Sequence, residues 1–308
     1  MKKWSISGLA AILTLLILSN SSSQDIQLLR VTELSHYPSA STLEYHKDKL
    51  YVIGDDARQV LVLDKDHQLL DSISLFEGEK KQLSKKTKPD IESTIQVKAS
   101  GKDYLLAFSS LSGPRRNKVL WIDLEKKTRD IRDFSLTHPE IREWNIEGTA
   151  LVGNKLILSN RANGSHPYNH ILVTDFDPVH GIKTDSLRLI RMDLPKNKFV
   201  SGLSSIIYYE PLDMLLFAAS TEYTDDAQAD GAIGDSYIGY IKNFSRKMSD
   251  KTLEADAFFN ISGALRSSGP QKIESLVVEE QSGEFITIHL ASDNDDGEST
   301  LFKMKWRL

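Results

Sequence analysis

The sequence predicts an all-β protein, a five-bladed β-propeller closed by its own N-terminal strand. A short phrase recurs along the chain, and several short apolar runs bounded by Gly, Asn, Asp or Ser follow each copy. After the N-terminal segment, no long stretch keeps the 3.6-residue period of an amphipathic helix. Recurrence at roughly 50 residues, with several strands in each copy, is typical of a propeller.

The recurring phrase consists of a small or acidic residue and a glutamate, followed by apolar residues. Its copies are Ser41–Glu44, Asp90–Ser93, Asn145–Gly148, Val200–Leu203 and Lys272–Ser275. In the fourth copy Gly202 stands in place of the glutamate. We expect each copy to begin one blade at its innermost strand.

The outer strands of the blades, together with one strand left over at the N-terminus, indicate how the ring closes. The expected outer strands of the first four blades are Leu69–Leu75, Thr128–Leu136, Leu187–Met192 and Ala255–Ile261. The last copy has room for only three strands before the chain reaches Leu308, and Ile26–Val31 is a spare strand. We expect this spare strand to complete the last blade, which protects the sheet edges. The alternative is six blades, with the extra blade in the long interval that contains the polar insertion Glu222–Asp235.

The first 23 residues have the pattern of a signal peptide. Lys2 and Lys3 precede an apolar stretch from Leu9 to Leu18, and small polar residues follow up to Ser23. The apolar stretch is about half the ~20 residues that a membrane-spanning helix needs. We therefore expect residues 1–23 to be removed and 24–308 to form one exported domain, periplasmic or extracellular. An uncleaved anchor is the alternative.

Composition excludes several classes of protein. The chain of 308 residues has no cysteine, which excludes a disulfide scaffold, a thiolate metal site and a cysteine nucleophile. A net charge of -5 argues against a nucleic-acid partner. No later stretch is apolar enough to span a membrane. We expect a monomer that acts on a small-molecule substrate or an envelope ligand.

The predicted topology brings acidic residues together at one mouth of the central channel. In a blade of antiparallel strands, the start of the first strand and the end of the second lie on the same face. This places four glutamates at the mouth: Glu44, Glu92, Glu147 and Glu274. Asp56 and Asn160, at the ends of second strands, add further oxygens. Because converging carboxylates repel one another, a hard divalent cation such as Ca²⁺ is a natural partner for these six residues.

Two other interpretations of the glutamates stay open. Arg161 could pair with Glu147 or Glu92 directly, or each glutamate could cap its blade by accepting backbone N–H bonds from the neighbouring blade. The loss of the glutamate at Gly202 opens space at the mouth, which suits a binding pocket.

Basic residues on the same face suggest an anionic substrate. Arg115, Arg116, Arg161 and His166 lie in or beside the loops after second strands, and His289 is expected at the end of one. Guanidinium groups suit phosphate and carboxylate, although ordinary solvated loop charges are the alternative. With a divalent cation, such a site suits hydrolysis of a phosphate ester, with Glu92, Glu147 and His289 as the candidate catalytic residues.

Two phrases resemble a known group of proteins. Ser41–Glu44 followed by Leu50–Asp56, and Asn145–Ala150, resemble secreted bacterial propellers of the phytase-like and esterase-like group. More distantly, the repeats resemble gluconolactonase and strictosidine-synthase propellers, which hold a divalent ion at the channel mouth. The resemblance implies that Glu44, Glu92 and Glu147 contact an ion or substrate. Asn145, where this group usually has Asp, departs from the pattern.

The sequence therefore leads to two hypotheses of function. The first is an exported hydrolase of small esters, lactones or phosphate esters that depends on a divalent cation. The alternative is a non-catalytic propeller that binds a ligand of the cell envelope.

Overall fold

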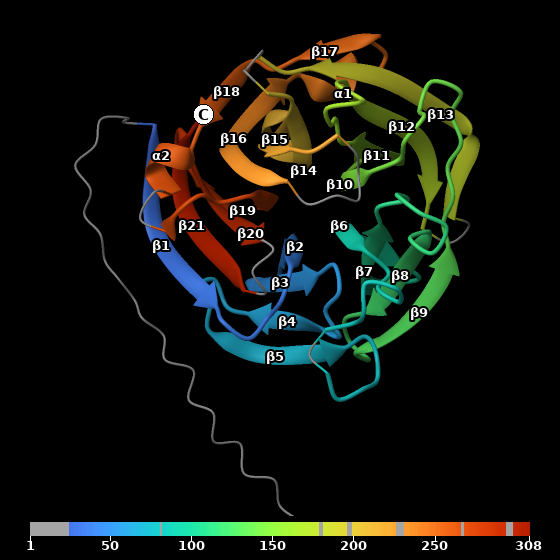
Figure 1. The fold of residues 1–308 in the computed structure, drawn as a ribbon, viewed down its shortest axis with the longest axis vertical. Coiled ribbons are helices and arrows are strands. Elements are labelled where there is room, and N and C mark those ends of the chain that lie inside the picture. Colours follow the sequence, from blue (N-terminus) through green and yellow to red (C-terminus); the bar gives the residue numbers. More distant parts are fainter. Residues whose placement is uncertain are drawn as a thin grey trace, which may run out of the picture.

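The computed structural model describes residues 25–308 apart from 81, 179–180, 196–198, 226–230, 266–267 and 294–297. The predicted signal peptide, residues 1–23, lies outside the described residues. Five small sheets stand in a ring around a central axis (Figure 1), so the prediction of a five-bladed β-propeller is confirmed. No helix in the described part of the chain is long and apolar enough to cross a membrane.

Each blade is an antiparallel sheet whose strands run outward from the axis in chain order. Blade 1 comprises β2 (Ala40–His46), β3 (Lys49–Gly54), β4 (Gln59–Leu63) and β5 (Leu69–Ser74). Blade 2 comprises β6 (Ile91–Ala99), β7 (Lys102–Ser109), β8 (Lys118–Asp123) and β9 (Thr128–Asp133). Blade 3 comprises β10 (Ile146–Val152), β11 (Lys155–Asn160), β12 (Asn169–Asp177) and β13 (Gly181–Asp193).

Blades 4 and 5 follow the same plan with additions. Blade 4 comprises β14 (Ser201–Tyr209), β15 (Met214–Tyr223), β16 (Ala232–Lys242) and β18 (Ala257–Asn260). Blade 5 comprises β19 (Ile273–Ser282), β20 (Phe285–Asp293), β21 (Ser299–Arg307) and β1 (Ile26–Leu34). The short strand β17 (Thr252–Glu254) pairs in parallel with β13 and extends blade 3, which the sequence analysis did not predict. In the described part of the chain, three short helices lie between strands: η1 (Glu210–Leu212), α1 (Phe244–Lys247) and α2 (Ser262–Leu265).

The N-terminal strand closes the ring as predicted. β1 pairs antiparallel with β21, from Ile26 opposite Trp306 to Leu34 opposite Ser299. The alternative of six blades is wrong, because the described residues form five sheets, and at the insertion Glu222 and Tyr223 pair with Ile233 and Ala232, which prolongs the hairpin of β15 and β16.

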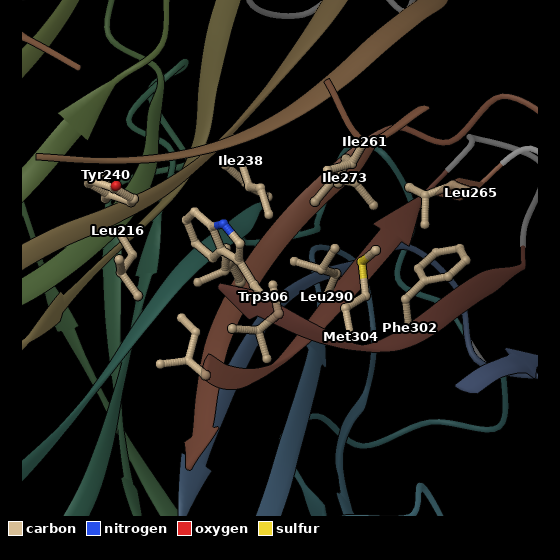
Figure 2. Packing of buried hydrophobic residues seen from close by; sticks show 14 of the residues in the cluster. Leu216, Ile238, Tyr240, Ile261, Leu265, Ile273, Leu290, Phe302, Met304 and Trp306 are labelled. Carbon is tan, nitrogen blue, oxygen red and sulfur yellow. The ribbon is translucent and has the colours of Figure 1, made fainter. Parts of the chain in front are cut away.

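The hydrophobic core is divided into five clusters, and each lies between two neighbouring blades. Figure 2 shows the cluster between blades 4 and 5, where Trp306 and Met304 of β21 pack near Leu216 and Ile238 of blade 4. Sheets packed face to face around a ring bury both faces of their middle strands, which is why the second and third strands are continuous apolar runs.

The innermost strands share one irregularity near the mouth. In each of them the pairing with the second strand skips one residue, a β-bulge. The skipped residues are Ser41, Glu92, Glu147, Ser204 and Glu274. The bulge marks equivalent positions in the five blades independently of residue type.

In blades 3, 4 and 5 the residue after the bulge lies against the next blade. Ser205 Oγ accepts a hydrogen bond from Leu276 N at 3.1 Å, and Ser275 Oγ accepts one from Leu43 N at 2.9 Å. Blade 3 has Gly148 at this position, and a Cβ there would lie 2.6 Å from the backbone nitrogen of Ile206. The inner strands of blades 3 and 4 are therefore too close for any side chain at position 148.

Substitution of Gly148 by alanine should destabilise the protein by about 1 to 3 kcal/mol, because the added methyl group overlaps the backbone of blade 4. Gly263 is the matched control, since a Cβ there meets nothing within 4 Å. Chemical unfolding of both variants measures the difference. Equal stability of Gly148→Ala and Gly263→Ala would contradict the close approach of the two strands.

A buried pair of histidines joins blade 1 to blade 5. His67, in the turn between β4 and β5, has Nε2 2.9 Å from Nδ1 of His289 in β20. His289 Nε2 donates to Glu279 at 2.8 Å, and His67 Nδ1 lies 2.9 Å from the Thr32 hydroxyl of β1. When both imidazoles are neutral, each of their four nitrogens has a hydrogen-bond partner. Thr32 donates to His67, His67 donates to His289, and His289 donates to Glu279.

Protonation of His289 breaks this chain of hydrogen bonds, because its Nδ1–H would then face the Nε2–H of His67. Burial lowers the pKa of His67 to about 2, with the neighbouring His289 adding to the shift, and burial also lowers the pKa of His289. In the unfolded chain each imidazole titrates near 6.5. The stability contributed by the neutral pair is therefore complete above pH 6.5 and is lost as the pH falls below it.

The variant His67→Gln should isolate this contribution. Between pH 7.5 and 5.5 the wild type should lose about 1.4 kcal/mol of unfolding free energy relative to the variant, which is the effect of one proton taken up on unfolding. Urea unfolding of both proteins at the two pH values checks this. If the stability difference between them does not change with pH, the buried pair is not held neutral.

Candidate functional site

Three of the predicted glutamates meet at one mouth of the channel. Glu92, Glu147 and Glu274 are each the second residue of an innermost strand, in β6, β10 and β19. Glu44 does not share this position. It is the fifth residue of β2, and the blade 1 equivalent of the three glutamates is Ser41. The expected placement of Glu44 at the mouth was wrong, because the phrase around it is shifted by three residues relative to the bulge.

A buried arginine holds the carboxylates of blades 3, 4 and 5 together. Arg161, which follows β11, has Nη1 3.7 Å from Glu147 and 3.4 Å from Glu274. Its Nη2 lies 3.3 Å from Glu222 at the end of β15 and 3.0 Å from Ser220 Oγ. Although burial opposes ionisation, the three glutamates raise the pKa of Arg161 above its usual range. The guanidinium is therefore a permanent charge at the centre of this group.

Gly202 is what allows Arg161 to reach the glutamates. A Cβ at position 202 would lie 2.6 Å from Cγ of Arg161 and 2.7 Å from the carbonyl oxygen of Ala162. The space opened by the missing glutamate is thus occupied by the arginine side chain. The bulge position of blade 4 is Ser204, two residues further along, so Gly202 is not the exact counterpart of the glutamates.

A second cation completes this half of the mouth. Lys272, just before β19, has Nζ 3.0 Å from Glu274 and 3.3 Å from Glu222. Glu147 also accepts a hydrogen bond from Asn145 Nδ2 at 2.7 Å. Burial raises the pKa of Glu147 to about 8, because Arg161 offsets only part of the cost of removing the carboxylate from water and Glu274 adds to it.

The other half of the mouth lies at the boundary of blades 1 and 2. Lys88 forms ion pairs with Asp55 and, at 2.9 Å, with Asp90. Arg116 Nη1 lies 2.9 Å from Asp90, and Ser110 Oγ donates to the same carboxylate at 2.5 Å. Burial raises the pKa of Asp55 in spite of Lys88.

Glu92 connects the two halves. One carboxylate oxygen from each of Asp55, Asp90 and Glu92 lies within 4.8 Å of the others. Burial, followed by the charges of Asp90 and Glu147, raises the pKa of Glu92 well above its usual range. We call the six carboxylates and four cations of both halves the mouth cluster: Asp55, Asp90, Glu92, Glu147, Glu222, Glu274, Lys88, Arg116, Arg161 and Lys272.

The mouth cluster carries two negative charges in excess when every group is ionised. Two protons or one divalent cation would balance them. Asp55 Oδ1 is buried and has no hydrogen-bond partner, so an oxygen of the three-carboxylate group is available to a ligand. The donor set, three carboxylates with an unsatisfied oxygen among them, fits a hard divalent cation.

Glu44 lies inside the channel and not at its mouth. The channel has a volume of about 180 Å³ and is lined by the inner strands, including Glu44, Thr94 and Thr149. Burial raises the pKa of Glu44 to about 8, opposed by a hydrogen bond from the Gln96 backbone. The carboxyl group is thus mainly protonated at neutral pH and contacts the innermost strand of blade 2.

The remaining predicted residues are distributed over several places. Asn160 is used within the fold, since its Oδ1 accepts from Asn145 N at 2.7 Å and its Nδ2 donates to the Glu143 carbonyl at 3.2 Å. Asp56 has a buried oxygen without a hydrogen-bond partner, and burial raises its pKa to about 6. His289 lies in the middle of β20 between the blades, so its predicted place at the mouth was wrong.

The four basic residues do not form an anion-binding group. Arg116 and Arg161 are engaged by carboxylates. Arg115 is exposed and donates to the Lys86 carbonyl at 3.0 Å, and His166 lies 3.9 Å from Glu143. The expected convergence of these side chains on an anionic substrate does not occur.

Lys88, Lys272, Asp90 and Glu222 were missed as members of one cluster. Lys88 belongs to a lysine-rich loop, in which solvated charges are the usual expectation, yet its side chain is only 14% exposed. A signal was available for two of them: Asp90 and Lys272 both stand two residues before the glutamate of their phrase, so each enters the mouth beside that glutamate.

Comparison with known proteins agrees with the architecture. A family model described as a family of unknown function, DUF6929, matches residues 36–306. The chain belongs to this family. The matched range spans the propeller from just before blade 1 to the end of β21 and does not include β1. No curated protein matches this member of DUF6929.

Solved structures similar to this DUF6929 chain include a glutaminyl cyclase from Myxococcus xanthus, with a TM-score of 0.50 and 11% identity over 92% of this chain and 97% of that one. An α-L-arabinanase mutant from Cellvibrio cellulosa gives 0.47 and 11%, over 86% and 91%. A putative exported protein from Bacteroides fragilis gives 0.40 and 8%, over 96% and 95%. At these identities the likeness concerns the fold alone. The phytase-like and esterase-like group is not identified by these comparisons.

Substitution of Arg161 by methionine should destabilise the protein by about 3 to 5 kcal/mol, because three buried carboxylates then lose their shared cation. Arg115→Met is the matched control, since its guanidinium is exposed, and should change stability by less than about 0.5 kcal/mol. Thermal and chemical unfolding at pH 7 compare the two. An Arg161→Met protein as stable as the control would show that the ion pairs of the mouth cluster do not hold the blades together.

Proposed function

We propose that the protein is an exported hydrolase of small neutral esters or lactones that depends on a divalent cation bound at the mouth of the channel. The observation that carries the proposal is the group of Asp55, Asp90 and Glu92, whose oxygens lie within 4.8 Å of one another in the mouth cluster. The two uncompensated negative charges of the mouth cluster match one divalent cation.

The residues that would hold the cation are these three carboxylates, with Ca²⁺ the first candidate because it accepts several carboxylate oxygens in flexible geometry. When bound, such an ion polarises an ester carbonyl or lowers the pKa of a bound water. Lys88 now neutralises Asp55 and Asp90, so a cation has to compete with its ammonium group. Arg116 stays beside Asp90 and keeps that side chain in position.

Glu147 is the proposed proton acceptor above pH 8, where its carboxyl group, whose pKa burial raises to about 8, is ionised. Its carboxyl group belongs to blade 3, next to the Glu92 of blade 2, and is fixed by Asn145 and Arg161. A group held in one orientation by two partners is suited to take a proton from a water that attacks a bound ester. Lys272 and Arg161 would then stabilise negative charge that forms beside it.

A neutral substrate agrees better with the charges than a phosphate ester. Both arginines of the mouth are paired with carboxylates, and the whole mouth cluster is negative when its groups are ionised. A phosphate would have to displace those carboxylates. We therefore favour esters and lactones as substrates, in line with the resemblance of the sequence to esterase-like propellers.

The proposed location outside the cytoplasm comes from the sequence. It depends on the order of lysines, apolar stretch and small polar residues over 1–23. Extracellular calcium sites commonly bind at 10⁻⁴ to 10⁻³ M, so a weak site would be occupied there.

Calcium should raise the melting temperature. At a hundredfold excess over Kd the gain is about 2.7 kcal/mol, or roughly 5 °C or more for a domain of this size. Glu92→Gln should abolish the shift, and Lys88→Met should produce it at lower calcium because the competing ammonium is gone. Exposed Glu254→Gln is the control for charge removal. Differential scanning calorimetry with calcium, manganese and magnesium measures each case.

Activity is tested with a panel of an aryl ester, a lactone and a phosphate monoester, each with and without chelator. We expect turnover of the ester and the lactone that chelation removes. If no divalent cation changes the melting temperature and no substrate is turned over, the proposal fails and the non-catalytic binding propeller replaces it.

A further inference from the structure

Exposed aromatic side chains gather on one side of the mouth. Three aromatic residues stand among the large apolar side chains that are exposed in the described part of the chain: Tyr168 (48%), Phe199 (39%) and Tyr223 (45%). We call these three residues the aromatic rim. The exposed aliphatic residues are instead spread over outer strands and η1: Leu29, Leu69, Leu70, Ile131 and Leu212.

The chain positions of the aromatic rim place all three residues on the mouth face. Tyr168 precedes β12, Phe199 lies between β13 and β14, and Tyr223 ends β15. Connections from second to third strands and from one blade to the next lie at the mouth. Tyr223 follows Glu222 directly, and Glu222 pairs with Arg161 of the mouth cluster. The aromatic rim therefore borders the proposed site.

The side chains of the aromatic rim are held in place by contacts with one another and with neighbouring residues. The rings of Phe199 and Tyr223 lie 4.0 Å apart between centroids with an angle of 68°. Gly164 N donates to the Thr224 carbonyl at 3.0 Å, which ties the loop before β12 to the end of β15. The guanidinium of Arg191 lies 4.0 Å from the ring centroid of Tyr168. Half-exposed aromatic faces held in this way are typical of ligand-binding surfaces.

The rim stands across the mouth from the proposed cation site. Asp55, Asp90 and Glu92 belong to the boundary of blades 1 and 2, whereas Phe199 and Tyr223 border blade 4. In a ring of five, blade 4 is opposite that boundary, as the positions of β14–β16 and of β3 and β6 in Figure 1 show. A ligand that spans the mouth would thus meet carboxylates at one end and aromatic rings at the other.

We propose that the substrate carries a ring with an apolar face, joined to the ester or lactone group, and that this ring packs on Phe199 and Tyr223. This inference depends on the proposed function for the reacting group and adds the substrate class. Both a sugar ring, through its C–H face, and an aromatic ring have this chemistry. A small neutral ester without such a ring would make no contact with the aromatic rim.

Three acetate esters with different alcohol parts test the proposal: ethyl acetate, benzyl acetate and glucose 6-acetate. In Phe199→Ser and Tyr223→Ser, kcat/KM for at least one ring-bearing ester should fall about tenfold relative to that for ethyl acetate, the size expected for the loss of one aromatic contact. Leu69→Ser, which removes an exposed apolar side chain from β5, is the control and should leave the ratios unchanged. The ester that responds identifies the ring as sugar or aromatic.

Binding of non-reactive ring ligands separates the two proposals. Methyl glucoside and benzyl alcohol are titrated against wild type and both variants with saturation-transfer NMR. If a ring ligand binds wild type but not the variants while no ester is hydrolysed, the aromatic rim stands and the proposed hydrolase fails. If esters are hydrolysed with the same substrate ratios in wild type and variants, the hydrolase stands and the ring-binding role is overturned. Absence of both activities overturns both.

Discussion

The buried guanidinium of Arg161 is the interaction on which the mouth of the propeller depends. It follows the second strand of blade 3 and reaches carboxylates of blades 3, 4 and 5, so one side chain links three sheets. Without a shared cation, carboxylates this close would repel one another and push the inner strands apart. Gly202 provides the space for the arginine to cross, and Lys272 adds the charge that one guanidinium does not supply.

The mouth is asymmetric although the fold repeats. Blades 1 and 2 present Asp55, Asp90 and Glu92, where Lys88 and Arg116 leave an oxygen of Asp55 unsatisfied. Blades 3 to 5 present glutamates that are held by cations, with aromatic side chains beyond them on the rim. A fold made of repeats can thus have a site with two different sides. The backbone positions of the blades are equivalent, whereas the loops before and after them differ in charge and size.

The sequence could predict the ring of five blades and its closure by the first strand. Five repeats of short apolar runs indicate five sheets, and the one strand left over at the N-terminus fits the sheet that lacks a fourth strand. Glu92, Glu147 and Glu274 were correctly grouped, since they share one place in the repeat. Glu44 and Gly202 were misaligned, because a β-bulge fixes equivalence and a bulge has no residue signature. Lys88 lies in a loop four residues before Glu92, where side-chain direction depends on tertiary contacts that no local pattern contains.

Closure of the ring by β1 also determines how the protein can misassemble. Among the described strands β1 pairs with β21 alone, at the other end of the chain, so this pairing has the largest loop-closure entropy in the fold and is expected to form after the blades with local contacts. When β1 detaches, the edge of β21 and the buried face of Trp306 remain as a template for another strand. At high concentration the β1 of a second chain can fill that place, which makes reciprocal strand exchange the expected route to dimers of this protein.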